Sequence, residues 1–169
     1  QIPSTKKVKN GHEFTSNPCE MLSIGKKNIF DLVRQYGLPM NKEHDNRFTL
    51  PPYVLDTKDL FFSFLRGYLD GDGSITHSLI PMISFEMNEA CAKQVQKFLR
   101  DEIGVKSSIS HVGKGQNKCL DFSLRVGGQT PCLVFMYYLY ATHNQTPYLD
   151  RKFQKASEIW AKIFPKHIN

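Results

Sequence analysis

Residues 65–73 read Leu-Arg-Gly-Tyr-Leu-Asp-Gly-Asp-Gly and decide how the chain is expected to fold. They end an apolar segment, DLFFSFLRGYLD, whose spacing predicts a helix from Asp59 that is capped by Asp56 or Thr57. Glycine then stops this helix at the end of the stretch. Residues with little or no side chain recur every four positions along this helix. They form one face that would let a second helix backbone approach closely. The residues that form this predicted helix interface are Ser63, Gly67 and Gly71.

Two acidic residues, Asp70 and Asp72, lie at the end of the predicted helix. If two such helices pack together, each end presents the Asp72 carboxylate and the free backbone carbonyl of Gly71. Both are hard oxygen ligands that suit Mg²⁺ when water and phosphate oxygens complete the site. Asp70 lies inside the last helical turn, and we expect it to cap or brace the helix end.

Asp-Gly-Asp-Gly is also found in ordinary turns and at the start of calcium loops. In an EF-hand frame that begins at Asp70, the glycine position holds Ile75 and the final glutamate position holds Pro81, so a calcium loop is excluded. A plain helix-stop turn remains open, because glycine and aspartate end many helices.

Strand-like and helical patterns alternate after this stretch. Alternating polarity predicts a half-buried sheet with one polar face, and the apolar stripes predict helices against its other face. The fold class is therefore α+β. The predicted elements are two strands within 74–87, a helix from Asn88 to Ile103, strands near 105–112 and 118–126, a helix through Tyr140 with Thr130 as its cap, and a helix from about Leu149.

This order and the nine-residue stretch resemble the LAGLIDADG homing endonucleases over about residues 59–163, including 101–105 (DEIGV) and 147–152 (PYLDRK). The resemblance implies an αββαββα repeat with an antiparallel β-saddle that binds DNA. It implies Asp72 as the catalytic metal ligand, with Mg²⁺ or Mn²⁺ as cofactor. It also implies Lys152 near the attacking water and the scissile phosphate, with Lys42 as its counterpart in the preceding half. For each lysine the alternative is an ordinary surface position.

Members of this family read DNA with the concave face of the sheet. Strand side chains at period two can address successive base edges, and lysines near the turns can contact phosphates and set the salt dependence of binding. A solvated strand residue is the alternative for each position. The expected base-reading residues are Arg125, Ser123, Asp121, Ser84, Glu86, Thr76 and Ser78, and the expected phosphate contacts are Lys106, Lys114, Lys118 and His111.

Residues 1–58 are interpreted as part of a preceding repeat plus a linker, and residues 59–169 as a complete second repeat. Asn-x-Cys-x-x-x-Ser occurs at 17–23 and again at 117–123, and each copy is followed by a predicted helix and a lysine. The earlier copy falls in a predicted strand, 17–25, before a predicted helix, 27–36. Only one motif helix is present, so its partner would come from sequence before Gln1, another chain or a homodimer mate.

Composition favours an intracellular protein that binds a polyanion. The 169 residues carry a formal net charge of +6 and are 40% hydrophobic, enough for a full core. No run approaches the roughly 18 apolar residues of a membrane span, and no signal-peptide pattern opens the chain. We therefore expect no membrane association and a location in the cytoplasm, nucleoid or organelle matrix. The four cysteines are too widely spaced for a metal site and are expected to be reduced.

These features predict a site-specific, Mg²⁺-dependent endonuclease for double-stranded DNA, of the kind associated with introns or inteins. The rival prediction is a protein of the same fold that binds nucleic acid without cleavage, as an intron-RNA maturase or a DNA-binding regulator. The retained Asp72 favours the enzyme. The single motif favours the binder.

Overall fold

The computed structural model describes residues 6–9, 12–15, 28, 31, 34–36, 49–76, 79–112, 122–141 and 147–164. The chain divides into two compact units, Gln1–Tyr36 and Gly37–Asn169. In the first unit, β1 (Lys6–Lys9) and β2 (His12–Thr15) form an antiparallel hairpin. Residues 28, 31, 34 and 35 are helical, as predicted for 27–36, whereas the strand predicted at 17–25 lies outside the described residues.

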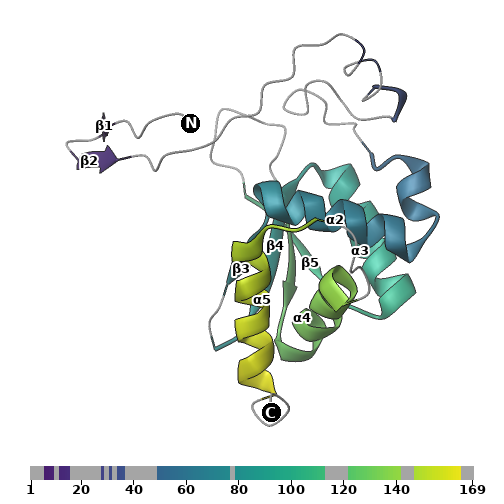
Figure 1. Ribbon diagram of the computed structural model, residues 1–169. Coiled ribbons are helices and arrows are strands. Elements are labelled where there is room, and N and C mark those ends of the chain that lie inside the picture. Colours follow the sequence, from purple (N-terminus) through teal and green to yellow (C-terminus); the bar gives the residue numbers. More distant parts are fainter. Residues whose placement is uncertain are drawn as a thin grey trace. The chain divides into compact units, whose positions relative to one another are not determined.

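The second unit contains the predicted αββαββα order (Figure 1). Its four strands form one antiparallel sheet in the order β3-β4-β6-β5, which confirms the α+β class. The elements are the 3-10 helix η1 (Pro52–Leu55), α2 (Lys58–Asp72), β3 (Ser74–Thr76), β4 (Met82–Met87), α3 (Glu89–Ile103), β5 (Ser108–His111), β6 (Phe122–Gly127), α4 (Gln129–Met136), the π-helix η2 (Tyr137–Ala141) and α5 (Asp150–Ile163).

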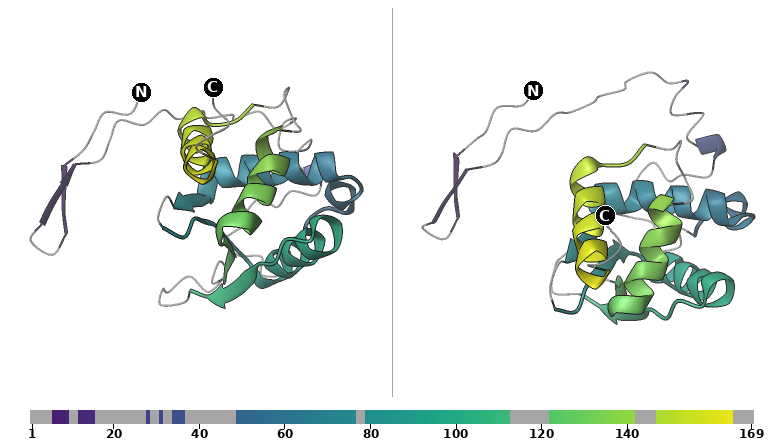
Figure 2. Two further views of the ribbon diagram at one scale, coloured as in Figure 1. Left: turned by 90° about the horizontal axis from the view of Figure 1, so that it is seen from below. Right: turned by 60° about the horizontal axis from the view of Figure 1, so that its bottom comes forward.

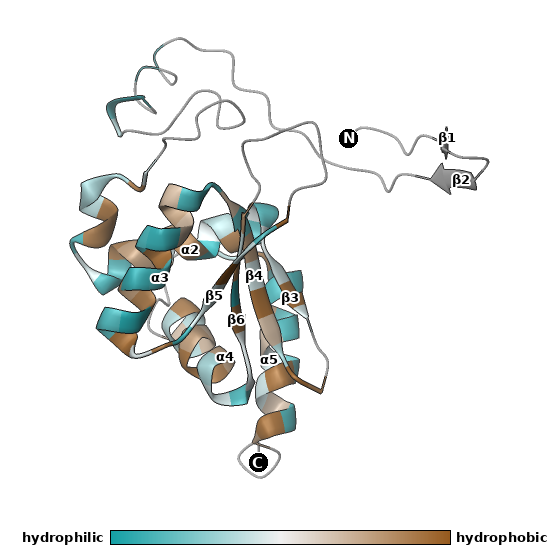
Figure 3. Ribbon diagram, turned by 180° about the vertical axis from the view of Figure 1, so that it is seen from behind, coloured by the Kyte–Doolittle hydropathy of each residue, from teal (hydrophilic) through white to brown (hydrophobic). Residues whose placement is uncertain are grey.

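The central strands β4 and β6 show how polarity alternates across the sheet. Ile83 lies opposite Val126 and Phe85 opposite Leu124, and all four side chains are buried. These side chains face the helices, which contact the sheet from one side. Figure 3 shows the opposite side of the sheet, across which no helix of the described ranges runs. Because successive strand residues point to opposite faces, the polar positions of β4 and β6 gather on this uncovered face.

Helix α2 is the central element of the core. Phe61 stacks on Phe98 of α3 with ring centroids 3.8 Å apart, and Phe62 stacks on Tyr138 of η2 with centroids 5.1 Å apart. Burial of each such side chain stabilises the fold by about 1.5–3 kcal/mol. The core thereby fixes the orientation of α2, and with it the position of the residues at its C-terminal end. The α2 side chains with 0% exposure are Phe61, Phe62, Leu65 and Leu69.

Two predicted helix ends differ from the observed ones. Helix α2 continues to Asp72, so Gly71 lies within the helix and Gly73 is its C-cap. The expected Thr130 cap of α4 is wrong: Gly128 is the N-cap, with a φ of 99° that favours glycine, and Thr130 lies in the first turn. The predicted α-helix through Tyr140 instead becomes the π-helix η2 from Tyr137, and the Arg66 Nη1 atom donates a hydrogen bond to the carbonyl of Leu139 within it.

We expect Asn88→Ala to lower the free energy of unfolding by about 1 kcal/mol. The Asn88 Oδ1 atom accepts a hydrogen bond of 2.8 Å from the backbone N–H of Cys91 and so caps α3. Asn88→Asp is the control, because aspartate keeps the acceptor oxygen. Urea unfolding curves should show a smaller loss for the aspartate variant, and equal losses would contradict the capping role.

Candidate metal and nucleic-acid site

Gly67 and Gly71 lie on the exposed face of α2, opposite its buried aromatic face. A Cβ atom built on either glycine would meet no atom within 4 Å. Ser63 is half-buried, and Leu60 on the same side is 46% exposed. Among the residues that the structure describes, no second helix covers this face. The predicted helix contact therefore needs a partner that is not part of the described unit.

The C-terminal end of α2 brings together three of the predicted site residues. Asp72 is the last helical residue and is exposed, and the Gly71 carbonyl belongs to the last turn, which a helix leaves without internal donors. The Lys152 Nζ atom donates a hydrogen bond to the backbone carbonyl of Gly73, the residue after Asp72. Figure 2 shows α5 beside this end of α2. Lys152, which is 79 residues from Gly73 in sequence, thus contacts the residue that follows the motif acid.

Lys152 occupies an unusual environment for a lysine, since its exposure is 6%. Burial lowers the pKa of its ammonium group below the ordinary lysine value, and neighbouring Arg151 lowers it further. The carboxylate of Asp70 acts in the opposite direction and raises the Lys152 pKa. The site therefore holds a buried cation that releases its proton more readily than a surface lysine.

The oxygen atoms at this helix end fit a hard divalent cation. Mg²⁺ is usually bound through one or two carboxylates, together with water and substrate phosphates. Asp72 can supply the carboxylate and Gly71 a carbonyl. Within the described ranges, no group of three or more His, Cys, Asp or Glu side chains could hold a metal ion. The residues thus fit one part of a Mg²⁺ site that a partner and DNA would complete.

Five of the predicted base-reading residues lie on the uncovered face of the sheet. Arg125 lies opposite Ser84 and Ser123 opposite Glu86, while Thr76 of β3 pairs with Met82 on the same side. The Arg125 Nε atom donates a hydrogen bond of 3.2 Å to the Ser123 hydroxyl, and Ser123 is only 3% exposed. The face is therefore polar, and its only cation among these five positions is Arg125.

The remaining predicted contacts are not brought onto that face. His111 pairs with Phe122, and its ring lies 5.1 Å from the Phe122 ring, on the helical side of the sheet. Lys106 is exposed in the segment before β5. The predicted residues outside the described part of the chain are Lys42, Ser78, Lys114, Lys118 and Asp121.

Several residues near the site were not predicted from the sequence. Ser108 and Ser110 of β5 share the uncovered face with Arg125 and Ser123, and the Ser-Ile-Ser alternation at 108–110 was the signal that could have found them. Arg66 is 1% exposed and donates to the Leu139 carbonyl. No local sequence pattern predicted this burial, because an arginine in a helix is usually exposed.

A LAGLIDADG-like domain family model matches residues 59–130, from the first turn of α2 to the start of α4. No curated protein matches the sequence. No helix in the described ranges is long and apolar enough to cross a membrane. LAGLIDADG domains occur in nucleases and in proteins that bind nucleic acid. The motif helix, the αββαββα order and the matched segment together show that residues 59–130 form a LAGLIDADG-like domain.

Proposed function

We propose that this protein is a site-specific endonuclease that hydrolyses phosphodiester bonds of double-stranded DNA with Mg²⁺. The observation that carries this proposal is the contact of Lys152 Nζ with the carbonyl of Gly73, directly after Asp72. This contact supports the proposal because it brings a buried cation to the helix end that carries Asp72 and the Gly71 carbonyl. Such groups favour hydrolysis of a phosphodiester, because they stabilise the negative charge that grows on the phosphoryl oxygens in the transition state.

Asp72 and the Gly71 carbonyl would hold the Mg²⁺ ion, or Mn²⁺ in its place. When bound, such an ion polarises a phosphoryl oxygen and lowers the pKa of a coordinated water. The Lys152 ammonium group would stabilise the negative charge of the attacked phosphate. Its lowered pKa would also help it to exchange a proton with water near the scissile bond. In the proposed reaction, water attacks phosphorus and the bond to the 3′-oxygen breaks.

The uncovered face of the sheet would recognise the DNA. Arg125 has the charge and planar donor geometry that suit guanine in the major groove, and the serines around it can donate or accept hydrogen bonds. Exposed Lys106 would contact phosphate. The formal net charge of +6 would attract the duplex over a longer range. We also propose that the protein is associated with an intron or intein and that it is intracellular.

A randomised duplex library tests the proposal for any target sequence. The protein is incubated with the library in Mg²⁺, and the new DNA ends are sequenced against an EDTA control. We expect ends that share a common flanking sequence and appear only with the metal. Ends at the frequency of the EDTA control would contradict cleavage.

The second candidate function is nucleic-acid binding without cleavage, either as a DNA-binding regulator or as a splicing cofactor for intron RNA. The glycine face of α2 favours this candidate. No helix of the described unit covers this face, and a cleaving site needs a second helix there to bring its second acid. The library experiment separates the two candidates. Selective retention of library duplexes without new ends, or tighter retention of structured RNA, would favour the binder.

We expect Arg125→Ala to weaken binding to a selected duplex by about 5- to 150-fold and to relax the preference at one base pair. The control is Arg100→Ala on α3, which removes the same charge from an exposed side chain paired with Asp101. Fluorescence anisotropy in Ca²⁺ measures both affinities without cleavage. Equal losses for the two variants would show that Arg125 contributes only charge.

A further inference from the structure

We propose that Arg66, Asp70 and Tyr140 form a positioning cluster that holds Lys152 at the end of α2. This inference deepens the proposed function and rests on it, because it concerns the same site. Asp70 connects the motif helix directly to α5. Its Oδ2 atom accepts a hydrogen bond of 2.9 Å from the backbone N–H of Leu149.

The Asp70 bond supplies a cap that α5 does not have in its own sequence. Leu149 is the N-cap residue of α5, and no side-chain cap bond is made from that position. The carboxylate of Asp70 also places negative charge at the N-terminal, positive end of the α5 dipole. Asp70 therefore fixes the start of α5 through both a hydrogen bond and electrostatic attraction.

The bonds of Asp70 and Lys152 join the same two segments. Asp70 binds Leu149, and Gly73 binds Lys152, so the contacts are three residues apart on each segment. Three residues are nearly one helical turn, which puts both contacts on the same side of α5. The first bond sets the register in which the flexible lysine side chain reaches Gly73. Loss of the Asp70 bond would release Lys152 from the motif end.

Arg66 and Tyr140 link α2 to α5 through η2. The Arg66 Nη1 atom donates a hydrogen bond of 2.9 Å to the Leu139 carbonyl in η2. The charge of Asp70 and the hydroxyl of Tyr140 both act electrostatically on the Arg66 guanidinium. A buried arginine beside a partly buried acid reduces the cost of removing each charge from water.

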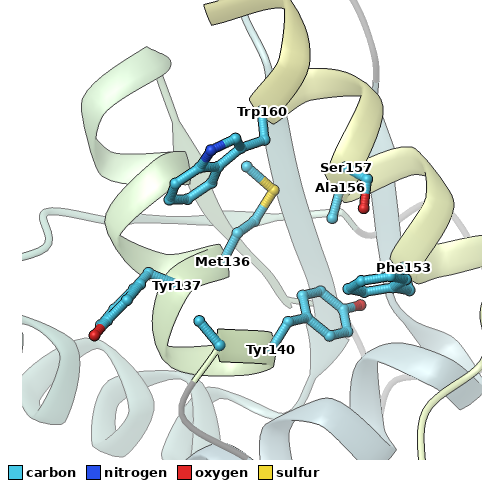
Figure 4. Close-up of a pocket in the computed structure, with 8 residues that line it drawn as sticks. Met136, Tyr137, Tyr140, Phe153, Ala156, Ser157 and Trp160 are labelled. Atoms are coloured by element: carbon cyan, nitrogen blue, oxygen red, sulfur yellow. The ribbon is translucent and has the colours of Figure 1, made fainter. Parts of the chain in front are cut away.

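The Tyr140 ring packs edge-on against residues on both sides of Leu149. Its centroid lies 5.9 Å from that of Tyr148. The centroid of Phe153, which Figure 4 shows beside Tyr140, lies 5.3 Å away. Tyr140 also lines, with Phe153 and Trp160, a cavity of about 500 Å³ between η2 and α5. The ring thus holds the first turn of α5 against η2, the segment that Arg66 fixes.

Two buried atoms indicate that this cluster does more than pack the helices. Asp70 Oδ1 and the Tyr140 hydroxyl have no hydrogen-bond partner in the described part of the chain. Burial of unsatisfied polar atoms is unfavourable, and an apolar contact would join two helices at lower cost. A buried polar atom that lacks a partner calls for an explanation, and a role in a catalytic site is one such explanation. Asp70 acts electrostatically on Lys152, and Tyr140 packs on Phe153, the residue after Lys152, so we assign both to the positioning of Lys152 at the end of α2.

Trace acetylation of the free protein tests the positioning of Lys152. Acetic anhydride labels exposed amines, and mass spectrometry gives the relative rate for each lysine. Asp70→Ala is expected to raise the Lys152 rate at least about fivefold, while Lys58 and Lys97 keep theirs, because the lost hydrogen bond frees only the start of α5. Asp70→Asn keeps an acceptor for Leu149 and should stay within about twofold of the wild type. An unchanged Lys152 rate in Asp70→Ala would overturn the proposal.

Glu89→Ala is the matched control, since it removes an exposed acid that pairs with Lys93 at 2.7 Å. It should leave the Lys152 rate unchanged, and a rise equal to that of Asp70→Ala would overturn the proposal. If Asp70→Ala raises the labelling rates of all lysines together, the Asp70→Glu variant separates the positioning of Lys152 from a general loss of stability. The added methylene displaces the carboxylate while keeping its charge, so a selective rise for Lys152 is expected, and a wild-type rate would count against the cluster.

The labelling needs neither DNA nor metal, so its outcome does not depend on whether the wild type cleaves. Where a cleaved duplex has been selected, a second measurement separates positioning from general stability. Asp70→Ala should lower the single-turnover cleavage rate and leave the Kd in Ca²⁺ unchanged. An equal loss of binding would show a structural role alone and would contradict the positioning role.

Discussion

Asp72→Asn should reduce the Mg²⁺-dependent cleavage rate at least about 1000-fold, because it removes the carboxylate at the exposed tip of α2 that is proposed to hold the metal. Binding to the same duplex in Ca²⁺ should change little, since the sheet face is not altered. Single-turnover cleavage and fluorescence anisotropy measure the two quantities separately.

Misfolding is not expected to explain this loss. Asp72 is the last residue of α2, where a negative charge faces the negative end of the helix dipole. Replacement by neutral asparagine should therefore stabilise the helix slightly, by about 0.3–1 kcal/mol. The control is Asp59→Asn, an exposed acid in the first turn of the same helix, which should cleave normally. If Asp72→Asn loses binding and folded structure together, a plain helix-stop turn explains the motif better.

Gly67→Leu should eliminate cleavage and assembly while the isolated domain remains folded. A Cβ atom at Gly67 meets no atom within 4 Å, so the domain itself can accept a larger side chain. Replacement of an exposed helical glycine should even raise its stability, by up to about 1 kcal/mol. A sister helix packed against that face would clash with leucine. We therefore expect higher thermal stability, loss of self-association in sedimentation velocity, and a cleavage rate at least about 100-fold lower.

Arg100→Leu is the control for Gly67→Leu, because it adds an apolar side chain at an exposed position of α3 outside the glycine face. It should leave association and cleavage unchanged. Gly67→Ala should have a smaller effect than leucine on assembly, since only one methyl group enters the contact. Cleavage by Gly67→Leu at the wild-type rate would show that no helix docks on this face.

The two measurements also separate the possible sources of the partner helix. Concentration-dependent association of the wild type would identify a homodimer mate. A wild type that stays monomeric and yet cleaves would contradict the homodimer and indicate another source of the second acid. In either case, the exposed glycines distinguish assembly from folding, because their substitution should disrupt assembly while the domain stays folded.

The sequence alone determined the motif helix, the alternation of strands and helices, and the polar face of the sheet. These features follow from short periodicities, 3.6 residues for a helix and two for a strand, which neighbouring residues specify. The predicted αββαββα order agrees with the elements from α2 to α4, because neighbouring residues specify these periodicities. The shared face of Ser84, Glu86, Ser123 and Arg125 follows from the same rule once the strands pair.

Helix boundaries were less well predicted, because competing local signals have similar energies. Thr130 and Pro131 form a plausible helix start, yet Gly128 with its positive φ begins α4 two residues earlier. The change to a π-helix at Tyr137 has no local signature. It coincides with the bond from Arg66 to Leu139, which comes from a segment 73 residues away.

Only the tertiary structure decided how the end of α2 meets α5. Asp70 was expected to brace its own helix, and it instead holds the backbone of Leu149, 79 residues away. The resemblance assigned Lys152 to the site, but its burial and its bond to Gly73 depend on how two helices pack across the core. Periodicity fixes which face of a helix is apolar, whereas a polar contact between distant segments depends on the packing of every element between them.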